Sequence, residues 1–200
     1  NQIAGGGGSV NDFTFNGGTP ATSTTQYYNG TTWNFACNSL NERFYHFSNY
    51  SSGASGFNSG GRISSTWVTS TEEVVKNNIP PYTTCVWTSG AGMNTPRAYL
   101  GGFGTQNSAV GVGGYSGGSP TVNSTEEYNG TSWTGAGSSI RPRYNTSAAG
   151  LQNAGILVGG RDVPTSQLSC TEEYDGSSWT AGGALSIARY GLAAAGTQNA

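Results

Sequence analysis

Charged residues are scarce in this 200-residue sequence, and basic residues are scarcer than acidic ones. Lysine and arginine together supply 8 residues, and the formal net charge is -2 at pH 7. Binding to nucleic acid or to an anionic membrane requires a basic patch, so the composition predicts neither partner. No apolar run approaches the roughly 18 residues of a membrane-spanning helix, so we expect no membrane insertion.

Histidine is even scarcer, because His46 is the only one in the chain. A histidine-rich metal site or a Ser-His-Asp triad is therefore not expected. The glycine-rich string at 111–117 superficially resembles a phosphate-binding loop, but no helical pattern follows it. We predict no catalytic residue, no metal and no cofactor.

The three cysteines, Cys37, Cys85 and Cys170, lack the spacing of metal ligands. Their odd number leaves two interpretations open. They are either three separate packed thiols, or Cys37 and Cys85 form a bridge, which requires Cα atoms within roughly 7 Å.

What the sequence does contain is a repeat. A tryptophan recurs at intervals of 54, 46 and 46 residues, and an arginine follows each one ten residues later. The four pairs are Trp33 and Arg43, Trp87 and Arg97, Trp133 and Arg143, and Trp179 and Arg189. Such self-similarity indicates one supersecondary unit used four times in a single array. We place the units at 1–56, 57–107, 108–153 and 154–200.

The fourth unit shows the expected strands most clearly. An apolar run at 156–160 ends in a glycine pair, and a second extended run covers 170–174. Asp175-Gly176 then predicts a tight type I′ hairpin turn before the strand of Trp179. After Arg189, residues 190–195 form another extended segment of mostly small residues. Four short strands per unit, with no helical periodicity, predict an all-β fold.

These residues resemble the kelch repeat. The resemblance rests on the glycine pair, the tyrosine before the turn, the tryptophan after it, and the arginine ten residues on. It covers units three and four fully, unit two well and unit one loosely. It implies a kelch-like β-propeller with four blades of four antiparallel strands, the strand after the arginine innermost and the tryptophan strand outermost. The ring is either complete in this chain, or completed by further sequence or by a second copy as a homo-oligomer.

The phrase at 125–133, Thr-Glu-Glu-Tyr-Asn-Gly-Thr-Ser-Trp, is also similar to kelch-like arrays in structural proteins of marine phages and some bacteria. This resemblance implies a virion or extracellular location, with other protein subunits of an assembly as partners. Because the chain opens and stops within a repeat, we expect a piece of a longer protein.

Paired glutamates recur at 72–73, 126–127 and 172–173. Paired carboxylates can serve acid/base catalysis or bind a metal, but neighbouring strand residues point to opposite faces. We therefore expect one glutamate per unit to accept hydrogen bonds from a periodic arginine between blades. The repeat glutamates that we select are Glu73, Glu127 and Glu173. On this interpretation, replacing Arg143 or Arg189 with alanine lowers the melting temperature.

Departures from the repeat are where a partner site is expected, because insertions map to loops. Unit two replaces the tight turn with a longer segment at 74–86, and unit one has a bulky aromatic run at 44–50. The candidate ligand or partner contacts are Tyr45, His46, Tyr50, Trp67 and Tyr82. These side chains either form a contact patch or pack between blades.

Three functions follow from these observations. The leading one is a non-catalytic structural or adhesive module that contacts protein subunits or a surface. The alternative is a carbohydrate-binding propeller that recognises cell-surface glycan through the aromatic residues of units one and two. A propeller enzyme is the third, and the sequence shows no cluster of polar residues that would carry catalysis.

Overall fold

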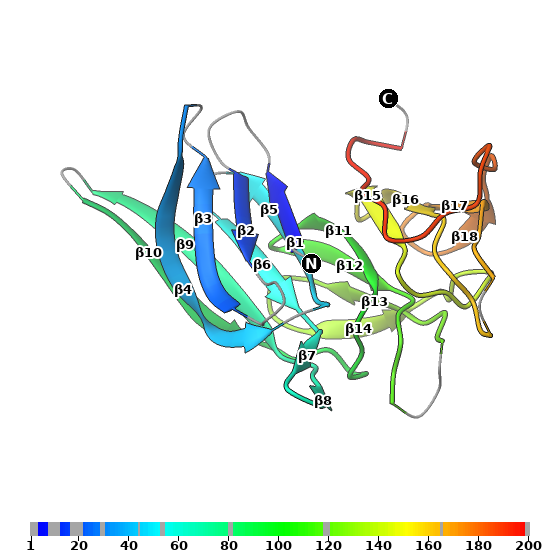
Figure 1. The fold of residues 1–200 in the computed structure, drawn as a ribbon, viewed down its shortest axis with the longest axis horizontal. Helices are drawn as coiled ribbons and strands as arrows, with labels where there is room; N and C mark the ends of the chain where they lie inside the picture. The colour runs from blue at the N-terminus through cyan, green and yellow to red at the C-terminus, as the bar shows by residue number, and fades with distance from the viewer. Residues whose placement is uncertain are drawn as a thin grey trace.

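The computed structural model shows a chain built from β-strands (Figure 1). It describes residues 4–7, 13–16, 22–28, 31–43, 45–52, 55–79, 82–117, 121–164 and 166–198. Every regular element in these ranges is a strand, which confirms the predicted all-β class. The described ranges contain no helix that could cross a membrane.

Four antiparallel sheets, each of four strands in chain order, make up most of the structure (Figure 1). The first sheet contains β1 (Ala4–Gly7), β2 (Phe13–Asn16), β3 (Thr22–Tyr28) and β4 (Trp33–Arg43). The second contains β5 (Phe47–Ser52), β6 (Ser55–Ser59), β9 (Thr71–Ile79) and β10 (Tyr82–Gly90). The third contains β11 (Gly101–Thr105), β12 (Ser108–Val112), β13 (Thr125–Tyr128) and β14 (Trp133–Ala136). The fourth contains β15 (Ser147–Leu151), β16 (Ala154–Val158), β17 (Thr171–Tyr174) and β18 (Trp179–Ala181). A small hairpin of β7 (Arg62–Ile63) and β8 (Thr66–Trp67) separates β6 from β9.

The first strands of consecutive sheets lie side by side. β1 is next to β5, β5 is next to β11, and β11 is next to β15. In Figure 1 these strands lie toward the middle of the molecule, and β10 and β18 lie at its periphery. The sheets therefore meet along their first strands, and the first and second sheets are also close at their fourth strands, β4 and β10.

The second, third and fourth sheets each begin one strand earlier than the repeat unit drawn from the sequence. β5 lies inside the predicted unit 1–56, β11 inside 57–107 and β15 inside 108–153. The repeat has the same period wherever its start is placed, so the periodicity alone leaves this boundary open. As a consequence, Arg43, Arg97 and Arg143 each lie at the junction between two sheets.

The segment at 190–195 is not a strand, although the sequence predicts one. It occupies the place in the repeat that β11 and β15 occupy in theirs. A strand needs a neighbour to accept and donate its backbone hydrogen bonds. β11 pairs with β12 and β15 with β16, whereas no following strand of the described chain pairs with 190–195.

The hairpin that joins the third and fourth strands of a sheet differs from the predicted type I′ turn. Tyr128 pairs with Trp133, so four residues form the loop. Gly130 has φ +88°, but Asn129 is not among the residues with positive φ, which a type I′ turn requires at both positions. Instead, the Asn129 side-chain oxygen accepts hydrogen bonds from the backbone N–H groups of Thr131 and Ser132, both at 2.9 Å. The asparagine is thus needed as a side-chain cap.

The second sheet keeps this architecture while lengthening the hairpin. β9 and β10 are each nine residues long, and their register runs from Tyr82 opposite Ile79 to Gly90 opposite Thr71. The insertion recognised at 74–86 therefore extends two strands.

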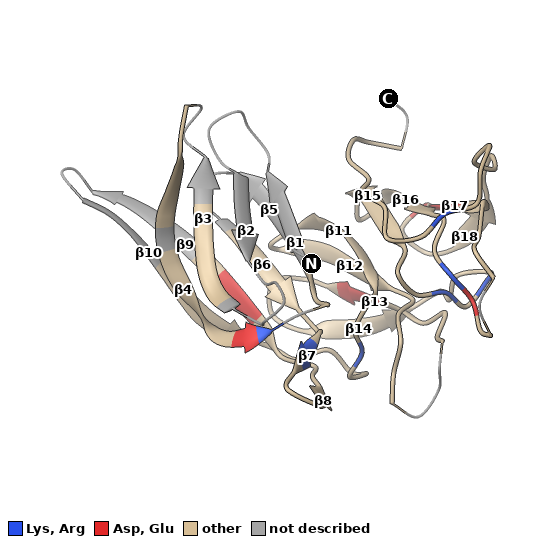
Figure 2. Cartoon of the chain, in the orientation of Figure 1, with Lys and Arg blue, Asp and Glu red and all other residues tan. Residues whose placement is uncertain are grey.

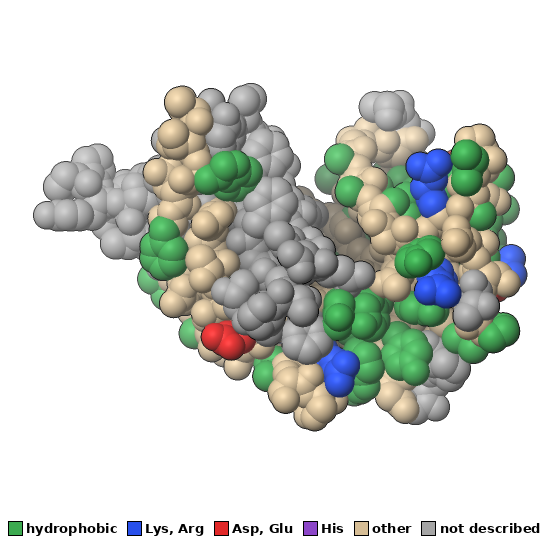
Figure 3. All heavy atoms as spheres, in the orientation of Figure 1, with side chains coloured by type: hydrophobic (Ala, Val, Ile, Leu, Met, Phe, Trp, Pro, Cys, Tyr) green, Lys and Arg blue, Asp and Glu red, His purple; other side chains and the backbone are tan. Residues whose placement is uncertain are grey.

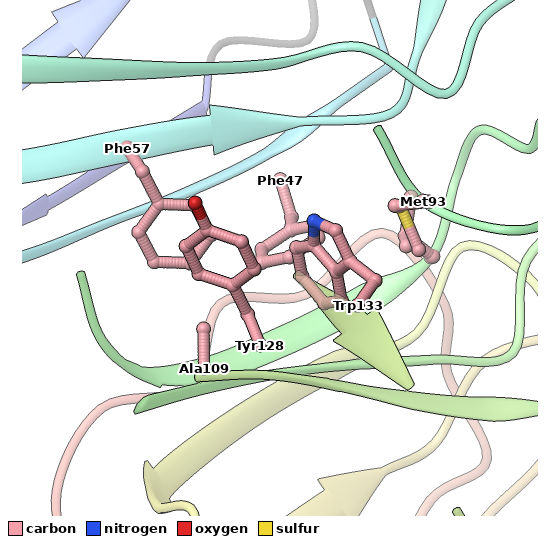
Figure 4. Packing of buried hydrophobic residues seen from close by; sticks show 7 residues of the cluster. Phe47, Phe57, Met93, Ala109, Tyr128 and Trp133 are labelled. Atoms are coloured by element: carbon pink, nitrogen blue, oxygen red, sulfur yellow. The ribbon is translucent and has the colours of Figure 1, made fainter. Parts of the chain in front are cut away.

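Apolar cores fill the spaces between consecutive sheets. The core between the second and third sheets combines rings from both (Figure 4). Phe47 meets Trp133 edge to face at 6.2 Å, and Tyr128 lies 5.0 Å from the same tryptophan. Between the third and fourth sheets, Phe103 meets Trp179 at 6.2 Å in the same geometry. The same edge-to-face packing of a phenylalanine on a tryptophan therefore occurs at both of these junctions.

The tryptophans of the second, third and fourth sheets are all buried at a sheet junction, and Trp133 and Trp179 also share their aromatic neighbours. Trp87, Trp133 and Trp179 are all buried, and Trp87 packs against Val74 and Cys37. Cys37 is disulfide-bonded and Cys170 is a free thiol, so the interpretation of three separate thiols is wrong. The Cys85 side chain, the expected partner of Cys37, lies outside the described residues.

Two glycines make room for the core phenylalanines. A Cβ atom at Gly155 would lie 2.2 Å from the Phe103 ring, and one at Gly102 would lie 2.0 Å from the Phe47 ring. Both distances are far shorter than a van der Waals contact, and both rings are buried. The absence of a side chain on each strand is therefore what allows the neighbouring sheet to approach.

Gly155→Ala is expected to destabilise the protein, because the added methyl group must displace the Phe103 ring. Overpacking of this kind costs about 1–3 kcal/mol, which lowers the melting temperature by roughly 2–10 °C in a chain of this size. Gly135→Ala is the matched control, because a Cβ there meets nothing within 4 Å. Thermal unfolding of both variants checks this, and equal melting temperatures would contradict the packing argument.

Candidate functional site

Each of the first three periodic arginines joins two sheets. Arg97 accepts a backbone hydrogen bond from Gly61 of the second sheet at 2.9 Å. Its side chain donates to Glu126 of the third sheet at 3.0 Å and to the Ser124 carbonyl at 2.7 Å. Burial lowers the pKa of Arg97 to about 10, and Glu126 opposes the shift, so the guanidinium stays charged at neutral pH.

The same arrangement occurs at the other two junctions. Arg43 and Arg143 are fully buried and pair with Glu72 and Glu172. Figure 2 shows the basic end of β4 against the acidic positions of β9. The arginine partner is thus the first glutamate of each pair.

The second glutamates of the second and third sheets, Glu73 and Glu127, face the following sheet, whereas Glu173 accepts a hydrogen bond from Gln198 at 3.2 Å. The Tyr128 hydroxyl donates to Glu73, and the Tyr174 hydroxyl donates to Glu127 at 2.8 Å. Burial and this hydrogen bond raise the pKa of Tyr174. The two carboxylates of a pair therefore diverge, as strand alternation requires, and each contacts a different neighbouring sheet.

A third contact links consecutive sheets through the periodic tryptophans. The Trp133 indole N–H donates to the Thr71 hydroxyl at 3.0 Å, and Trp179 donates to Thr125 at the same distance. The junctions of the second with the third sheet and of the third with the fourth thus combine an arginine–glutamate pair, a tyrosine–glutamate hydrogen bond and a tryptophan–threonine hydrogen bond. The junction of the first and second sheets keeps the arginine–glutamate pair, but Val74 stands opposite Trp87 and the Trp87 indole N–H has no hydrogen-bond partner among the described residues.

Arg189 differs from the other periodic arginines. Its carbonyl accepts the expected hydrogen bond from Gly160 at 2.9 Å. Its side chain, however, is exposed and donates to the Ile187 carbonyl at 3.4 Å. Among the described residues no carboxylate pairs with this guanidinium, so the arginine–glutamate pair expected from the repeat is not seen at Arg189.

A line of backbone hydrogen bonds connects the residues two positions after the arginines. Tyr99 donates to Tyr45, Asn145 donates to Tyr99, and Gly191 donates to Asn145, each at 2.9 Å. All four residues have left-handed backbone conformations, with φ between 50° and 64°. Such a conformation is unfavourable for tyrosine, and its repetition shows that the inter-sheet hydrogen bonds impose it.

This line of residues opens into an aromatic pocket. The pocket has a volume of about 360 Å³ and is lined by Tyr45, Trp67, Tyr99, Tyr115, Tyr144 and Asn145. Tyr45 stacks on Tyr99 at 4.2 Å, and Trp67 lies 5.5 Å from Tyr115. The β7–β8 hairpin contributes Trp67, while the other residues come from the segments that follow the arginines or the glycine pairs.

Two arginines lie at the margin of the aromatic pocket. Arg62 lies over the ring of the lining residue Trp67 at 5.3 Å, and Arg161 lies over the ring of the lining residue Tyr144 at 5.9 Å. In Figure 3 hydrophobic side chains gather beside the β7–β8 hairpin, with basic side chains next to them. The lining residues include no carboxylate, so the pocket presents aromatic faces, hydroxyl and amide groups, and nearby positive charge.

Only some of the contact residues predicted from the sequence line the aromatic pocket. Tyr45 and Trp67 come together in the aromatic pocket, whereas His46 is buried and does not line it. The side chains of Tyr50 and Tyr82 lie outside the described residues. Tyr99, Tyr115 and Tyr144 were not predicted, because they stand beside the periodic arginines or a glycine pair, where no insertion or aromatic run marks them in the sequence.

His46 is held in an apolar environment. Neither of its ring nitrogens has a hydrogen-bond partner in the described structure. Burial, together with the positive charge of Arg43, lowers its pKa to about 3. The described residues include no group of three or more side chains that could bind a metal ion.

Arg143→Ala is expected to lower the free energy of unfolding by about 3–5 kcal/mol, because Glu172 would be left buried without its cation. Arg189→Ala is the matched control and should change it by less than about 0.5 kcal/mol, because the side chain is exposed. Urea unfolding at pH 7 measures both. If both variants lost the same free energy of unfolding, the buried Arg143–Glu172 pair would add no stability beyond that of an exposed arginine.

His46 is expected to make stability depend on pH. Its pKa is near 6.5 in the unfolded chain and about 3 in the folded protein, so the unfolded chain takes up the proton first. Stability is therefore complete above pH 6.5 and falls as the pH drops toward 3, with about 2 kcal/mol lost by pH 5. His46→Gln should reduce this loss. Urea unfolding at pH 7 and pH 5 tests it, and an unchanged loss in the variant would refute the assignment.

Comparison with known protein families and curated proteins identified no relative of this chain. No protein-family model matches the sequence, and no curated protein matches it. The resemblance to the kelch repeat therefore rests on the residues quoted above. A fold can host many functions, so the function has to be argued from the aromatic pocket and the sheet junctions.

Proposed function

We propose that the chain is a non-catalytic, kelch-like β-propeller module. Four meandering sheets that meet along their first strands, with an arginine–glutamate pair at each of the three junctions between them, support this architecture. The inner position of the strands that follow Arg43, Arg97 and Arg143 is the position that the kelch resemblance implies. The paired glutamates of the second and third sheets are engaged in junction contacts, so they serve the repeat.

The module is adhesive and contacts carbohydrate through the aromatic pocket. One observation supports this proposal most strongly: aromatic rings from segments far apart in the sequence, between the sheets and on the β7–β8 hairpin, converge around one cavity. The apolar face of a sugar ring packs on an aromatic ring, and Asn145 and the tyrosine hydroxyls can bond the sugar hydroxyls. The marginal arginines favour glycans that carry a carboxylate or a sulfate group.

The proposed setting is a virion appendage or another extracellular assembly, where protein subunits are further partners. This setting follows from the resemblance to kelch-like arrays of phage structural proteins. Left-handed tyrosines support a binding role for the pocket, because strained backbone is often concentrated at functional sites.

A glycan array probed with the labelled chain tests the proposal. We expect binding that Trp67→Ala weakens at least tenfold, corresponding to about 1.4 kcal/mol. Tyr115→Phe should bind better than Trp67→Ala, because it keeps the aromatic face. Leu151→Ala is the control, since this exposed residue lies at the far end of β15.

Two results would overturn carbohydrate binding. One is the absence of any bound glycan at high protein concentration. The other is binding that Trp67→Ala leaves unchanged while thermal unfolding shows the variant to be folded.

A further inference from the structure

The positive charge of Arg161 is not paired within the described part of the chain. Its guanidinium lies over the Tyr144 ring at 5.9 Å and over the Tyr190 ring at 4.5 Å. Its Nε is buried without a hydrogen-bond partner, and no carboxylate of the described residues forms an ion pair with it. We propose that Arg161 forms a second subsite, which binds the carboxylate or sulfate of the sugar next to the one held in the aromatic pocket. The proposal rests on the carbohydrate binding proposed above and names the class of glycan.

Other arginines of the chain have acceptors within it. The three at the sheet junctions pair with buried glutamates. Arg141 pairs with Asp162 at 2.8 Å, so the carboxylate that follows Arg161 in the sequence is already engaged. Arg189 donates to the Ile187 carbonyl. A partly buried cation without an acceptor is costly, and a bound anion would remove this cost.

The backbone and the two tyrosine rings hold Arg161 in place before any ligand binds. Its N–H donates to the Tyr144 carbonyl at 2.8 Å, and its carbonyl accepts from the Tyr144 N–H at 2.9 Å. A guanidinium that packs on aromatic rings keeps its own N–H groups for acceptors. Two of these groups match two oxygens of a carboxylate or a sulfate.

The neighbours of Arg161 are those that the repeat gives to this position. Arg161 follows the glycine pair of the fourth sheet, as Tyr115 follows that of the third. The Tyr115 ring meets Tyr144, which follows the third periodic arginine, at 5.8 Å. Arg161 meets Tyr190, which follows the fourth periodic arginine, in the corresponding way. The residue that the repeat places beside Arg161 is thus present, and it is a tyrosine.

Tyr144 connects Arg161 to the aromatic pocket. It lines the pocket, and its ring is next to Tyr115, which in turn lies 5.5 Å from Trp67. The row of rings therefore ends at the Arg161 guanidinium. A linear glycan that packs one sugar on these rings brings the acidic group of the next sugar to this cation. Since the pocket lining includes no carboxylate, an acidic ligand meets no like charge there.

Calorimetric titration with matched glycans tests the subsite. The probes are a sulfated oligosaccharide with its desulfated form, and a uronic-acid oligosaccharide with its carboxyl-reduced form. The chain should bind the acidic form of at least one pair roughly tenfold more tightly than the neutral form, because hydrogen bonds to charged groups are the stronger ones. The pair that shows the preference identifies the anion as sulfate or carboxylate.

Arg161→Met removes the charge and keeps an apolar side chain on the tyrosine rings. It should abolish the preference for the acidic form and leave the affinity for the neutral form unchanged. Trp67→Ala should weaken both forms alike, because it alters the pocket. Arg189→Met is the matched control, since it removes one positive charge from an exposed arginine and should leave the preference intact. Arg161→Gln replaces Arg161→Met if the latter does not fold.

Four results would overturn the subsite. Equal affinity of the unmodified chain for acidic and neutral forms overturns it without affecting carbohydrate binding. A preference that persists in the folded Arg161→Met variant assigns the acidic group to another cation. A chain that binds neither form overturns carbohydrate binding together with the subsite. Tighter binding of a glutamate-rich peptide than of either acidic glycan assigns Arg161 to a protein partner.

Discussion

The buried arginine between consecutive sheets is the contact on which the rest of the structure depends. Arg97 is held by the backbone of the second sheet and reaches Glu126 and main-chain carbonyls of the third. A guanidinium suits this position because its planar group donates several hydrogen bonds in fixed directions. Since a buried charge without its partner is costly, the pair specifies which sheet follows which and at what register.

The aromatic pocket is a consequence of these junctions. The residue two positions after each arginine is bound to the next one by a backbone hydrogen bond, which holds Tyr45 and Tyr99 in left-handed conformations. Their rings then stack, and Trp67 reaches them from the β7–β8 hairpin. The proposed binding surface is thus built from the repeat itself, with one insertion added.

The sequence predicted the all-β class and the recurrence of Trp133 and Trp179, because hydrophobic and turn residues recur at a fixed interval. It did not show that Glu126, and not Glu127, pairs with the arginine. Strand alternation predicts that neighbouring side chains point to opposite faces of a sheet, but it does not predict which face packs against the preceding sheet. Nor did it identify Tyr99 as a pocket residue, because no local preference signals a left-handed tyrosine. Tyr45 was found because it lies in the bulky aromatic run at 44–50, and Trp67 because it has no counterpart in the other units.

A double-mutant cycle on Arg97 and Glu126 tests the central role of the junction pair most directly. Urea unfolding would be measured for the wild type, Arg97→Met, Glu126→Leu and the double variant. If the pair joins the sheets as described, each single change leaves a buried charge, so the double variant should be more stable than the sum of the single losses by about 1–3 kcal/mol. Additive losses within about 0.5 kcal/mol would show that the two side chains act independently and would contradict the account.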